Sequence, residues 1–277
     1  MLLNIRNPNS NIAFKVSKPA IWLASYPRSG SAYVRSLIAN YVSESKEPLS
    51  LQDIVNSTFG EHEERIYFEL TGKQPQDRNL SDEMATRIAY FDRARELTNR
   101  SLPMIKTHTL FGAVNGYPTF KFIPGDRVIH LVRHPCDVAI SFAHYYGIDI
   151  EAAIDNLLDN DNYYNGWPNA GYEVIGSWSQ HTHSWMLDVG APVYRIRYDD
   201  LVTRPVEMLL EIADFVGLGR NEGRASRAGR CQSNEERSPF GHTSIFEQNA
   251  SGSKALPLSQ GGRAASFEGL AIYEVAF

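Results

Sequence analysis

The sequence predicts an α/β protein with a central parallel sheet flanked by helices. Four short apolar runs, at residues 20–25, 103–107, 127–132 and 192–198, have the length and composition of buried strands. Three of them are followed by residues with the period of an amphipathic helix. Strands that alternate with helices are typical of a parallel sheet wrapped by helices.

The length and composition fit one globular domain. The chain has 277 residues, of which 43% are hydrophobic and 21% are charged. These fractions exclude a disordered or a fibrous chain, and the length is sufficient to bury a sizeable core. We expect a single domain over residues 1–277, with a core at 20–218, an irregular segment at 219–262 and a C-terminal helix at 263–277.

Charge and cysteine content narrow the choice of partners and compartment. The chain has 27 Lys and Arg against 32 Asp and Glu, a net charge of −5, and two cysteines. This balance argues against nucleic-acid binding, although a local basic site for a small anion is compatible with it. No apolar run approaches the roughly 20 residues that span a bilayer, and the N-terminal residues lack the apolar core of a signal peptide. We therefore expect a cytoplasmic protein with no membrane partner.

The first strand leads into a helix. After residues 20–25, apolar side chains recur at positions i, i+3, i+4, i+7 and i+8, which places them on one helical face: Val34, Leu37, Ile38, Tyr41 and Val42. The second strand, at 103–107, leads instead into a glycine-containing loop. Pro135 can occupy the first turn of a helix that follows the third strand and runs to about Gly147. The fourth strand precedes a helix around residues 206–213, which Gly217 is placed to end.

Helical insertions separate these strands. Ser81 or Asp82 can cap a helix that runs to about Thr98. A short helix is expected near residues 151–158 and a longer one near 172–189, because the latter segment has one apolar stripe at helical spacing. Residues 219–262 are rich in Gly, Ser, Arg and Asn and have little periodicity, so an irregular segment is expected there.

The loop after the first strand is the most informative stretch. Residues 25–35 read SYPRSGSAYVR and connect a buried strand to a helix. Backbone N–H groups at such a turn point toward one spot, where the positive end of the helix dipole also favours an anion. Gly30 allows a close approach of the backbone, Ser29 and Ser31 add hydroxyl donors, and Arg28 adds a charged planar fork. A plain Gly/Ser turn with a solvated arginine is the alternative interpretation.

A second pair of residues strengthens the anion-site interpretation. Arg133 follows the strand at 127–132, and Ser141 lies eight residues later in the next helix. Arginine can bind a phosphate group bidentately, and the serine hydroxyl adds a donor. The nucleotide-triphosphate signature GxxxxGK[ST] is absent from the sequence, which disfavours an ordinary P-loop kinase or ATPase.

Together these stretches resemble the sulfotransferase family, which uses 3′-phosphoadenosine-5′-phosphosulfate (PAPS) and releases 3′,5′-adenosine bisphosphate (PAP). The family's 5′-phosphosulfate loop, typically YPKSG, is similar to residues 26–30, followed here by Ser31, Ala32 and Tyr33. The resemblance implies a P-loop-like sulfotransferase architecture. It also implies that Arg133 and Ser141 bind the nucleotide 3′-phosphate.

Two further matches complete the resemblance, which spans about residues 21–218. A Lys-Thr-His stretch that carries the chemistry in the family matches Lys106, Thr107 and His108. The aromatic residue before an acidic pair, near the adenine in the family, matches Tyr198. The resemblance therefore implies that Arg28, Ser29, Gly30, Ser31, Ala32, Tyr33, Arg133, Ser141 and Tyr198 bind the cofactor.

The sequence also departs from the family's pattern. Arginine stands at position 28, where lysine is usual, and Ala32 and Tyr33 stand where threonine and tryptophan are common. The Arg-Lys-Gly loop that closes over the 3′-phosphate is not found, and Gly261-Gly262-Arg263 is only a faint candidate. We therefore expect the chain to stop before that loop.

The resemblance implies sulfuryl transfer to a hydroxyl, or less favourably an amine, of a small or medium-sized acceptor. His108 is the candidate base because a neutral imidazole can take a proton near pH 7. Lys106 and Arg28 are candidates for stabilising the leaving phosphate. No metal is expected, because cationic side chains take its part. His181 and His183 are set aside as a metal pair, since residues two apart on a helix do not share a face.

Alternatives of other classes stay open at the level of sequence. A protein that binds PAP or PAPS without transfer activity and an ATP-dependent phosphotransferase are both compatible with an anion site. Five aromatic residues between positions 145 and 167 are candidates for lining an acceptor site or for packing at a helix edge: Tyr145, Tyr146, Tyr163, Tyr164 and Trp167.

Overall fold

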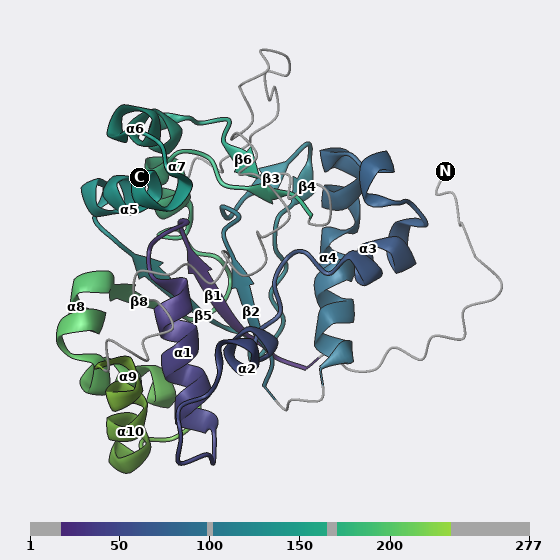
Figure 1. The fold of residues 1–277 in the computed structure, drawn as a ribbon. Coiled ribbons are helices and arrows are strands. Elements are labelled where there is room, and N and C mark those ends of the chain that lie inside the picture. The colour runs from purple at the N-terminus through teal and green to yellow at the C-terminus, as the bar shows by residue number, and fades with distance from the viewer. Residues whose placement is uncertain (1–17, 99–101, 165–170, 234–277) are drawn as a thin grey trace.

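The computed structural model describes residues 18–98, 102–164 and 171–233. Within these residues a four-stranded parallel sheet has the order β2-β1-β5-β8 (Figure 1). Its strands are β1 (Ile21–Ser25), β2 (Met104–Thr107), β5 (Arg127–Val132) and β8 (Val193–Arg197). All four lie in the predicted apolar runs, and the predicted α/β class with a central parallel sheet is confirmed.

The helices and the remaining strands follow the chain as described here. The helices are α1 (Ser31–Val42), α2 (Leu51–Asn56), α3 (Glu64–Thr71), the 3₁₀ turn η1 (Pro75–Asp77), α4 (Leu80–Leu97), α5 (Pro135–Tyr146), α6 (Ile150–Leu158), α7 (Trp178–Ser184), α8 (Tyr198–Thr203), α9 (Pro205–Phe215) and α10 (Glu222–Ser233). Two short antiparallel pairs join β3 (Ala113–Val114) to β4 (Tyr117–Pro118) and β6 (Tyr163–Tyr164) to β7 (Glu173–Val174).

The central strands are buried on both faces, because successive side chains of a strand point to opposite sides. In β1, Ile21 and Leu23 pack with α1, α9 and α10 on one face. Trp22 and Ala24 pack with apolar residues of α3 and α4 on the other face. Figure 1 shows α1, α9 and α10 grouped on one side of the sheet and α4 on the other.

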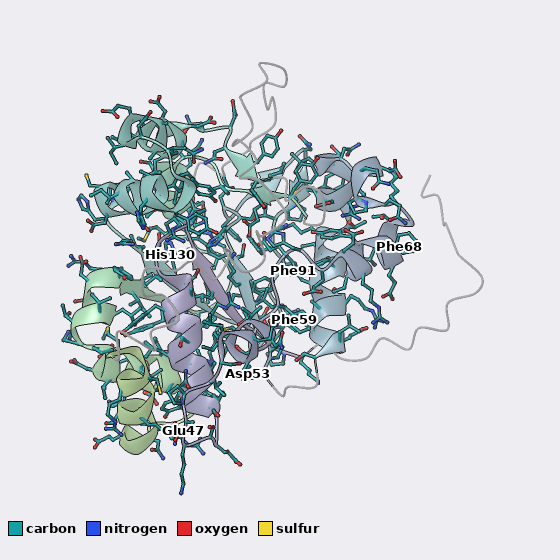
Figure 2. All side chains as sticks on the ribbon, in the orientation of Figure 1. Glu47, Asp53, Phe59, Phe68, Phe91 and His130 are labelled. Carbon is teal, nitrogen blue, oxygen red and sulfur yellow. The ribbon has the colours of Figure 1, made fainter. Side chains whose placement is uncertain are left out.

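Side chains fill the layer between the sheet and α4. The Trp22 ring meets the Phe91 ring edge-on, with the centroids 4.8 Å apart. Figure 2 labels Phe91 in this layer and Phe68 of α3 on the outside of the molecule, where 46% of Phe68 is exposed. The inward faces of α3 and α4 therefore build a second core against the sheet.

A buried carboxylate joins the sheet to the insertion. Asp126, which precedes β5, accepts hydrogen bonds from the backbone N–H of Ala20 at 2.7 Å and from the indole N–H of Trp22 at 3.2 Å. Arg95 of α4 forms a bidentate ion pair with the same carboxylate, at 2.7 and 2.6 Å. Such charge-assisted pairs fix geometry, so α4 is held in one orientation relative to the start of β1.

Several predicted boundaries are wrong, each for a local reason. Asn79, rather than Ser81 or Asp82, caps α4, and Asp82 closes the capping box from the third helical position. The long helix expected at 172–189 is instead the strand β7 followed by the short helix α7. Gly176 takes a positive φ of 66°, and the Ser177 side chain then caps α7, so the apolar stripe is divided between two elements.

The segment expected to be irregular contains a helix. α10 covers Glu222–Ser233, and Ala225 and Ala228 are fully buried against α1 and α9. Arg227 donates to the carbonyl of Ser43, at 2.7 Å, and to that of Asn40 at the end of α1. Small residues allow this close approach although they give no apolar stripe. The C-terminal helix expected at 263–277 lies outside the described residues. No helix among the described residues is long and apolar enough to cross a membrane.

Candidate active site

The predicted anion loop lies at the carboxyl end of β1. Arg28 has a left-handed φ of 65° and Gly30 a φ of 101°, and the Ser29 N–H donates to the Tyr26 carbonyl at 3.2 Å. A non-glycine residue in this region is uncommon and is found where surrounding contacts hold it. The turn delivers the chain directly into α1. It therefore places the backbone of the loop over the N-terminus of that helix.

The first turn of α1 offers unpaired donors. The N–H groups of Ser31 and Ala32 have no intrahelical acceptor, as is general for a first turn. α1 has no side-chain N-cap hydrogen bond and no acidic residue in its first turn. The positive end of the helix dipole therefore faces the loop, and no acidic side chain in the first turn offsets it. This arrangement suits an anion.

Arg28 reaches across to the helix after β5. Its Nε donates to the Ser141 hydroxyl at 3.2 Å, and its guanidinium carbon lies 4.1 Å from the centroid of the Tyr145 ring. Ser141 and Tyr145 are one turn apart on α5. Burial lowers the pKa of Arg28, although the group stays charged at neutral pH. The two predicted phosphate-binding stretches thus meet through side chains.

Arg133 connects the anion loop to Tyr198, the residue predicted to lie near the adenine. It donates to the Arg28 carbonyl at 3.1 Å, and its guanidinium carbon lies 4.3 Å from the centroid of the Tyr198 ring. A Cβ atom on Gly30 would lie 2.6 Å from two carbons of that same ring. Glycine is therefore required at position 30 by both its φ and its packing. The structure places Arg28, Gly30, Arg133, Ser141 and Tyr198 around one spot.

Two buried donors at this spot have no partner within the described chain. They are the Ser29 hydroxyl and Nε of Arg133. A buried donor without a hydrogen bond costs free energy, so a ligand that accepts from them would remove this cost. The residues present therefore fit a phosphate-bearing nucleotide. Tyr33 lies partly buried on the same first turn of α1, where burial raises the pKa of its phenol.

His108 follows β2 and is held in one tautomer. Its Nδ1 lies 2.6 Å from the carbonyl oxygen of Ser25. Because a carbonyl can only accept, Nδ1 carries the hydrogen, and the lone pair of the neutral ring is on Nε2. Burial, reinforced by the charge of Lys106, lowers the pKa of His108 to about 3. The imidazole is therefore neutral at pH 7, as a base must be.

Lys106 points to a carboxylate that sequence reasoning missed. Its Nζ lies 3.6 Å from Oε1 of Glu173, and that same oxygen lies 3.0 Å from Nε2 of His62. Burial alone would raise the pKa of Glu173, yet the charge of Lys106, with His62 and His108, holds it well below its usual range. Neither His62 nor Glu173 belongs to a readable motif, because each lies in an insertion.

Tyrosines of α5 and β6 lie near this group. Tyr145 and Tyr146 meet edge-on with ring centroids 4.8 Å apart, and the rings of His62 and Tyr164 lie 6.4 Å apart. Burial, then the negative charge of Glu173, raises the pKa of Tyr164. Tyr164 of β6 therefore lies beside His62, and burial, with a smaller contribution from the charge of Glu173, raises the pKa of Tyr146 on α5. Trp167, the fifth aromatic candidate, lies outside the described residues.

No metal-binding cluster is present among residues 18–98, 102–164 and 171–233, where no group of three or more His, Cys, Asp and Glu side chains could hold an ion. His181 is fully buried in α7, and His183 lies two positions further along that helix. Gly261-Gly262-Arg263, the faint candidate for a closing loop, lies outside the described part of the chain.

Comparisons with known proteins show which sequences this chain resembles. The family model described as "Sulfotransferase domain" matches residues 18–255. The rat (Rattus norvegicus) protein Sulfotransferase 2A6 is 30% identical over 95 residues, which are 33% of this chain and 31% of the relative. Sulfotransferase 1A1 of Bos taurus is 29% identical over 96 residues, 33% of this chain and 30% of that relative. The matched segment thus spans about a third of these curated relatives.

Solved structures resemble the fold over more of the chain. A mouse sulfotransferase complexed with PAP is 20% identical, with a TM-score of 0.50 over 78% of this chain and 64% of that one. Retinol dehydratase in a complex with retinol and PAP is 16% identical, with a TM-score of 0.52 over 88% and 72% of the two chains. At these identities the likeness concerns the fold.

Proposed function

Because the chain belongs to the sulfotransferase domain family, we propose that it transfers the sulfuryl group of PAPS to a hydroxyl of a small or medium-sized acceptor. One observation carries the proposal: Arg28, Arg133 and Ser141, which are far apart in sequence, surround a single spot at the carboxyl ends of β1 and β5. That edge of an open α/β sheet is where ligands bind. The small content of cysteine supports a cytoplasmic site of action.

The donor nucleotide would be bound by residues from three strand ends. Arg28, Ser29, Gly30, Ser31, Ala32 and Tyr33 would hold the 5′-phosphosulfate through backbone and side-chain donors. Arg133 and Ser141 would bind the 3′-phosphate, and the Tyr198 ring, already against Arg133 and Gly30, would lie along the adenine. PAPS supplies the activated sulfuryl group, and no metal is needed where cationic side chains offset the charge.

The chemical step requires one base and two cations. The Nε2 lone pair of His108 would take the proton of the acceptor hydroxyl as its oxygen bonds to sulfur. The bond between sulfur and the bridging oxygen breaks, and its electron pair stays on the phosphate, so that PAP leaves. Lys106 and Arg28 would stabilise the charge that develops on that oxygen, in the way that fixed cations act in phosphoryl transfer.

The proposal is tested first by ligand stabilisation. A ligand at 100 times its dissociation constant raises the free energy of unfolding by about 2.7 kcal/mol. We expect PAP to raise the melting temperature and ATP with magnesium to leave it nearly unchanged. A shift with ATP alone would favour the phosphotransferase alternative, and no shift with PAP would contradict the proposed donor site.

The second test concerns the base. We expect His108→Ala to lose transfer from PAPS to acceptor by at least a hundredfold, in line with the size of general-base contributions, while it still binds PAP. His144→Ala, at an exposed histidine of α5, is the matched control. Wild-type-like turnover of the His108 variant would remove His108 as the base. PAP binding without turnover in the wild type would favour a binding protein.

A further inference from the structure

Glu173 is held in place from both sides of the chain. It lies on β7 and is 5% exposed. The Tyr172 N–H before it donates to the Glu83 carboxylate at 2.6 Å, and the Val174 carbonyl after it accepts from the Leu110 N–H at 2.8 Å. The second bond ties β7 to the chain two residues beyond His108. The Glu173 carboxylate is therefore fixed relative to the proposed base.

The two partners of Glu173 present hydrogens to the same oxygen. Because a carboxylate only accepts, Nε2 of His62 carries its hydrogen and donates to Oε1 at 3.0 Å. Lys106 offers its ammonium group to that oxygen at 3.6 Å. Nδ1 of His62 is buried and has no partner within the described chain. The carboxylate thus orients both a lysine and an imidazole.

Basic groups from several parts of the chain lie near Glu173. They are Lys106 on β2, Arg87 on α4 and the imidazoles of His62 and His108. A proton that reaches His108 creates a second cation beside Lys106, in a buried setting where like charges repel strongly. Glu173 is the carboxylate paired with Lys106, and so it is placed to offset that added charge.

We propose that Glu173, with His62 as its hydrogen-bond partner, is a positioning residue for the proton transfer: it holds Lys106 and offsets the charge of the imidazolium formed at His108. This inference rests on the function proposed above. It adds Glu173, from the segment between α6 and α7, to the residues at the strand ends that are proposed to carry the reaction. Glu173 acts through its neighbours and takes no proton itself.

The negative charge of Glu173 should favour proton transfer but disfavour binding of the donor nucleotide. A carboxylate next to Lys106 repels phosphate groups and competes for the lysine that should face them. Glu173 should therefore speed the transfer step and weaken nucleotide binding. A residue needed only for folding would not separate these two effects, since damage to the fold lowers both.

The first measurement is PAP affinity by calorimetry, which needs no acceptor. We expect Glu173→Gln to bind PAP about threefold to tenfold more tightly than wild type. The reason is that the variant loses a negative charge that repels the phosphate groups, a change worth roughly 1 kcal/mol. Glu173→Asp keeps the charge and should bind PAP as wild type does. Glu64→Gln removes a carboxylate that pairs with Arg78 in the segment between β1 and β2, and it is the matched control.

The second measurement is transfer from PAPS to phenols of graded acidity. Phenol itself ionises at a pH of about 10, as tyrosine does, whereas dinitrophenols are already ionised at neutral pH. Glu173→Gln should lose at least tenfold in kcat with phenol and little with a dinitrophenol, which needs no base. Glu173→Asp should recover part of the loss with phenol.

Each outcome bears on one proposal or the other. PAP affinity of Glu173→Gln that equals or falls below that of wild type overturns the role of Glu173, as does an equal loss with both phenols. If wild type binds PAP but transfers to no phenol, the proposed transfer chemistry fails and the role of Glu173 in proton transfer fails with it, whereas a wild type that transfers beside a Glu173→Gln variant that behaves identically overturns the role of Glu173 alone. Should Glu173→Gln not fold, Glu173→Met removes the charge with an apolar side chain of similar length.

Discussion

Arginine rather than lysine at position 28 changes what the anion loop can do on its own. A guanidinium group can donate from one edge while it stacks on a ring, which an ammonium group cannot. Arg28 does both, since it bonds to Ser141 and covers Tyr145. The loop is thereby joined to α5 by side chains of the protein itself. This preorganisation lowers the conformational cost of binding a phosphate group.

Arg133 provides a prediction at the scale of one residue. We expect Arg133→Lys to weaken PAP binding by about tenfold, although the charge is kept, because lysine loses the bidentate fork, the stacking on Tyr198 and the bond to the Arg28 carbonyl. Calorimetry with PAP measures the change. Arg197→Lys is the control, since the Arg197 side chain is 74% exposed. Equal affinities of the two variants would contradict the placement of Arg133 at the 3′-phosphate.

Residues at the strand ends could be predicted, whereas their partners from the insertions could not. Arg28, His108 and Arg133 each follow a strand directly, so the topology alone brings them to one edge of the sheet. Glu173 and His62 are 111 positions apart and meet through tertiary packing. No spacing in the sequence marks them as partners. A buried acid in a segment with an apolar stripe was the one available signal, and that stripe suggested a helix.

Among the elements, α10 shows how close packing can replace an apolar stripe. Its contact with α1 and α9 is made by Ala225 and Ala228, and a Cβ on Gly229 would lie 3.0 Å from Val206. The helix is further attached through Arg227, which bonds to carbonyls at the end of α1. Periodicity of large apolar residues cannot detect such a helix, because its buried face consists of the smallest side chains.

A prediction at the scale of this element follows from the close approach. We expect Ala225→Leu to lower the free energy of unfolding by about 1–3 kcal/mol, the usual cost of overpacking a filled site. Urea unfolding followed by circular dichroism measures it. Arg224→Leu, at the exposed neighbouring position, should change the stability by less than about 0.5 kcal/mol. An equal effect of both substitutions would mean that α10 is not packed as described.

The misassigned segment at 172–189 illustrates a different limit. Its apolar residues repeat at helical spacing, but Gly176 adopts a left-handed φ and separates β7 from α7. The backbone of β7 instead pairs with β6 and bonds to Leu110. Local periodicity was thus overruled by hydrogen bonds to distant chain. The same arrangement places Glu173 inside the molecule.

Buried histidines make a prediction for the whole molecule. Burial, and Arg195 nearby, lowers the pKa of His130 to about 4, and burial lowers those of His108 and His181 as well. Between about pH 6.5 and 4 the unfolded chain therefore binds protons that the folded chain does not, so stability falls as the pH falls. Each such histidine contributes a slope of about 1.4 kcal/mol per pH unit. Glu173, whose pKa is depressed, adds a loss in the same direction below about pH 4.5.

Urea unfolding at several pH values between 7 and 5 tests this dependence. We expect the unfolding midpoint to decrease steadily over that range. His130→Leu should reduce the slope by about one histidine's share, whereas His144→Leu, at an exposed site, should leave it unchanged. A midpoint that is the same at pH 7 and pH 5 would show that these histidines titrate normally in the folded protein.

The Asp126 carboxylate joins helix α4 to the central sheet. It collects donors from the start of β1 and from Arg95 of α4. The helical insertion is therefore not an interchangeable module. A chimaera that receives the insertion of a relative must import an arginine at the place of Arg95, or else bury an uncompensated acid beneath its first strand. Exchange of this helical segment between such proteins would depend on a residue at the amino end of β1, whereas the candidate site lies at the carboxyl end of that strand.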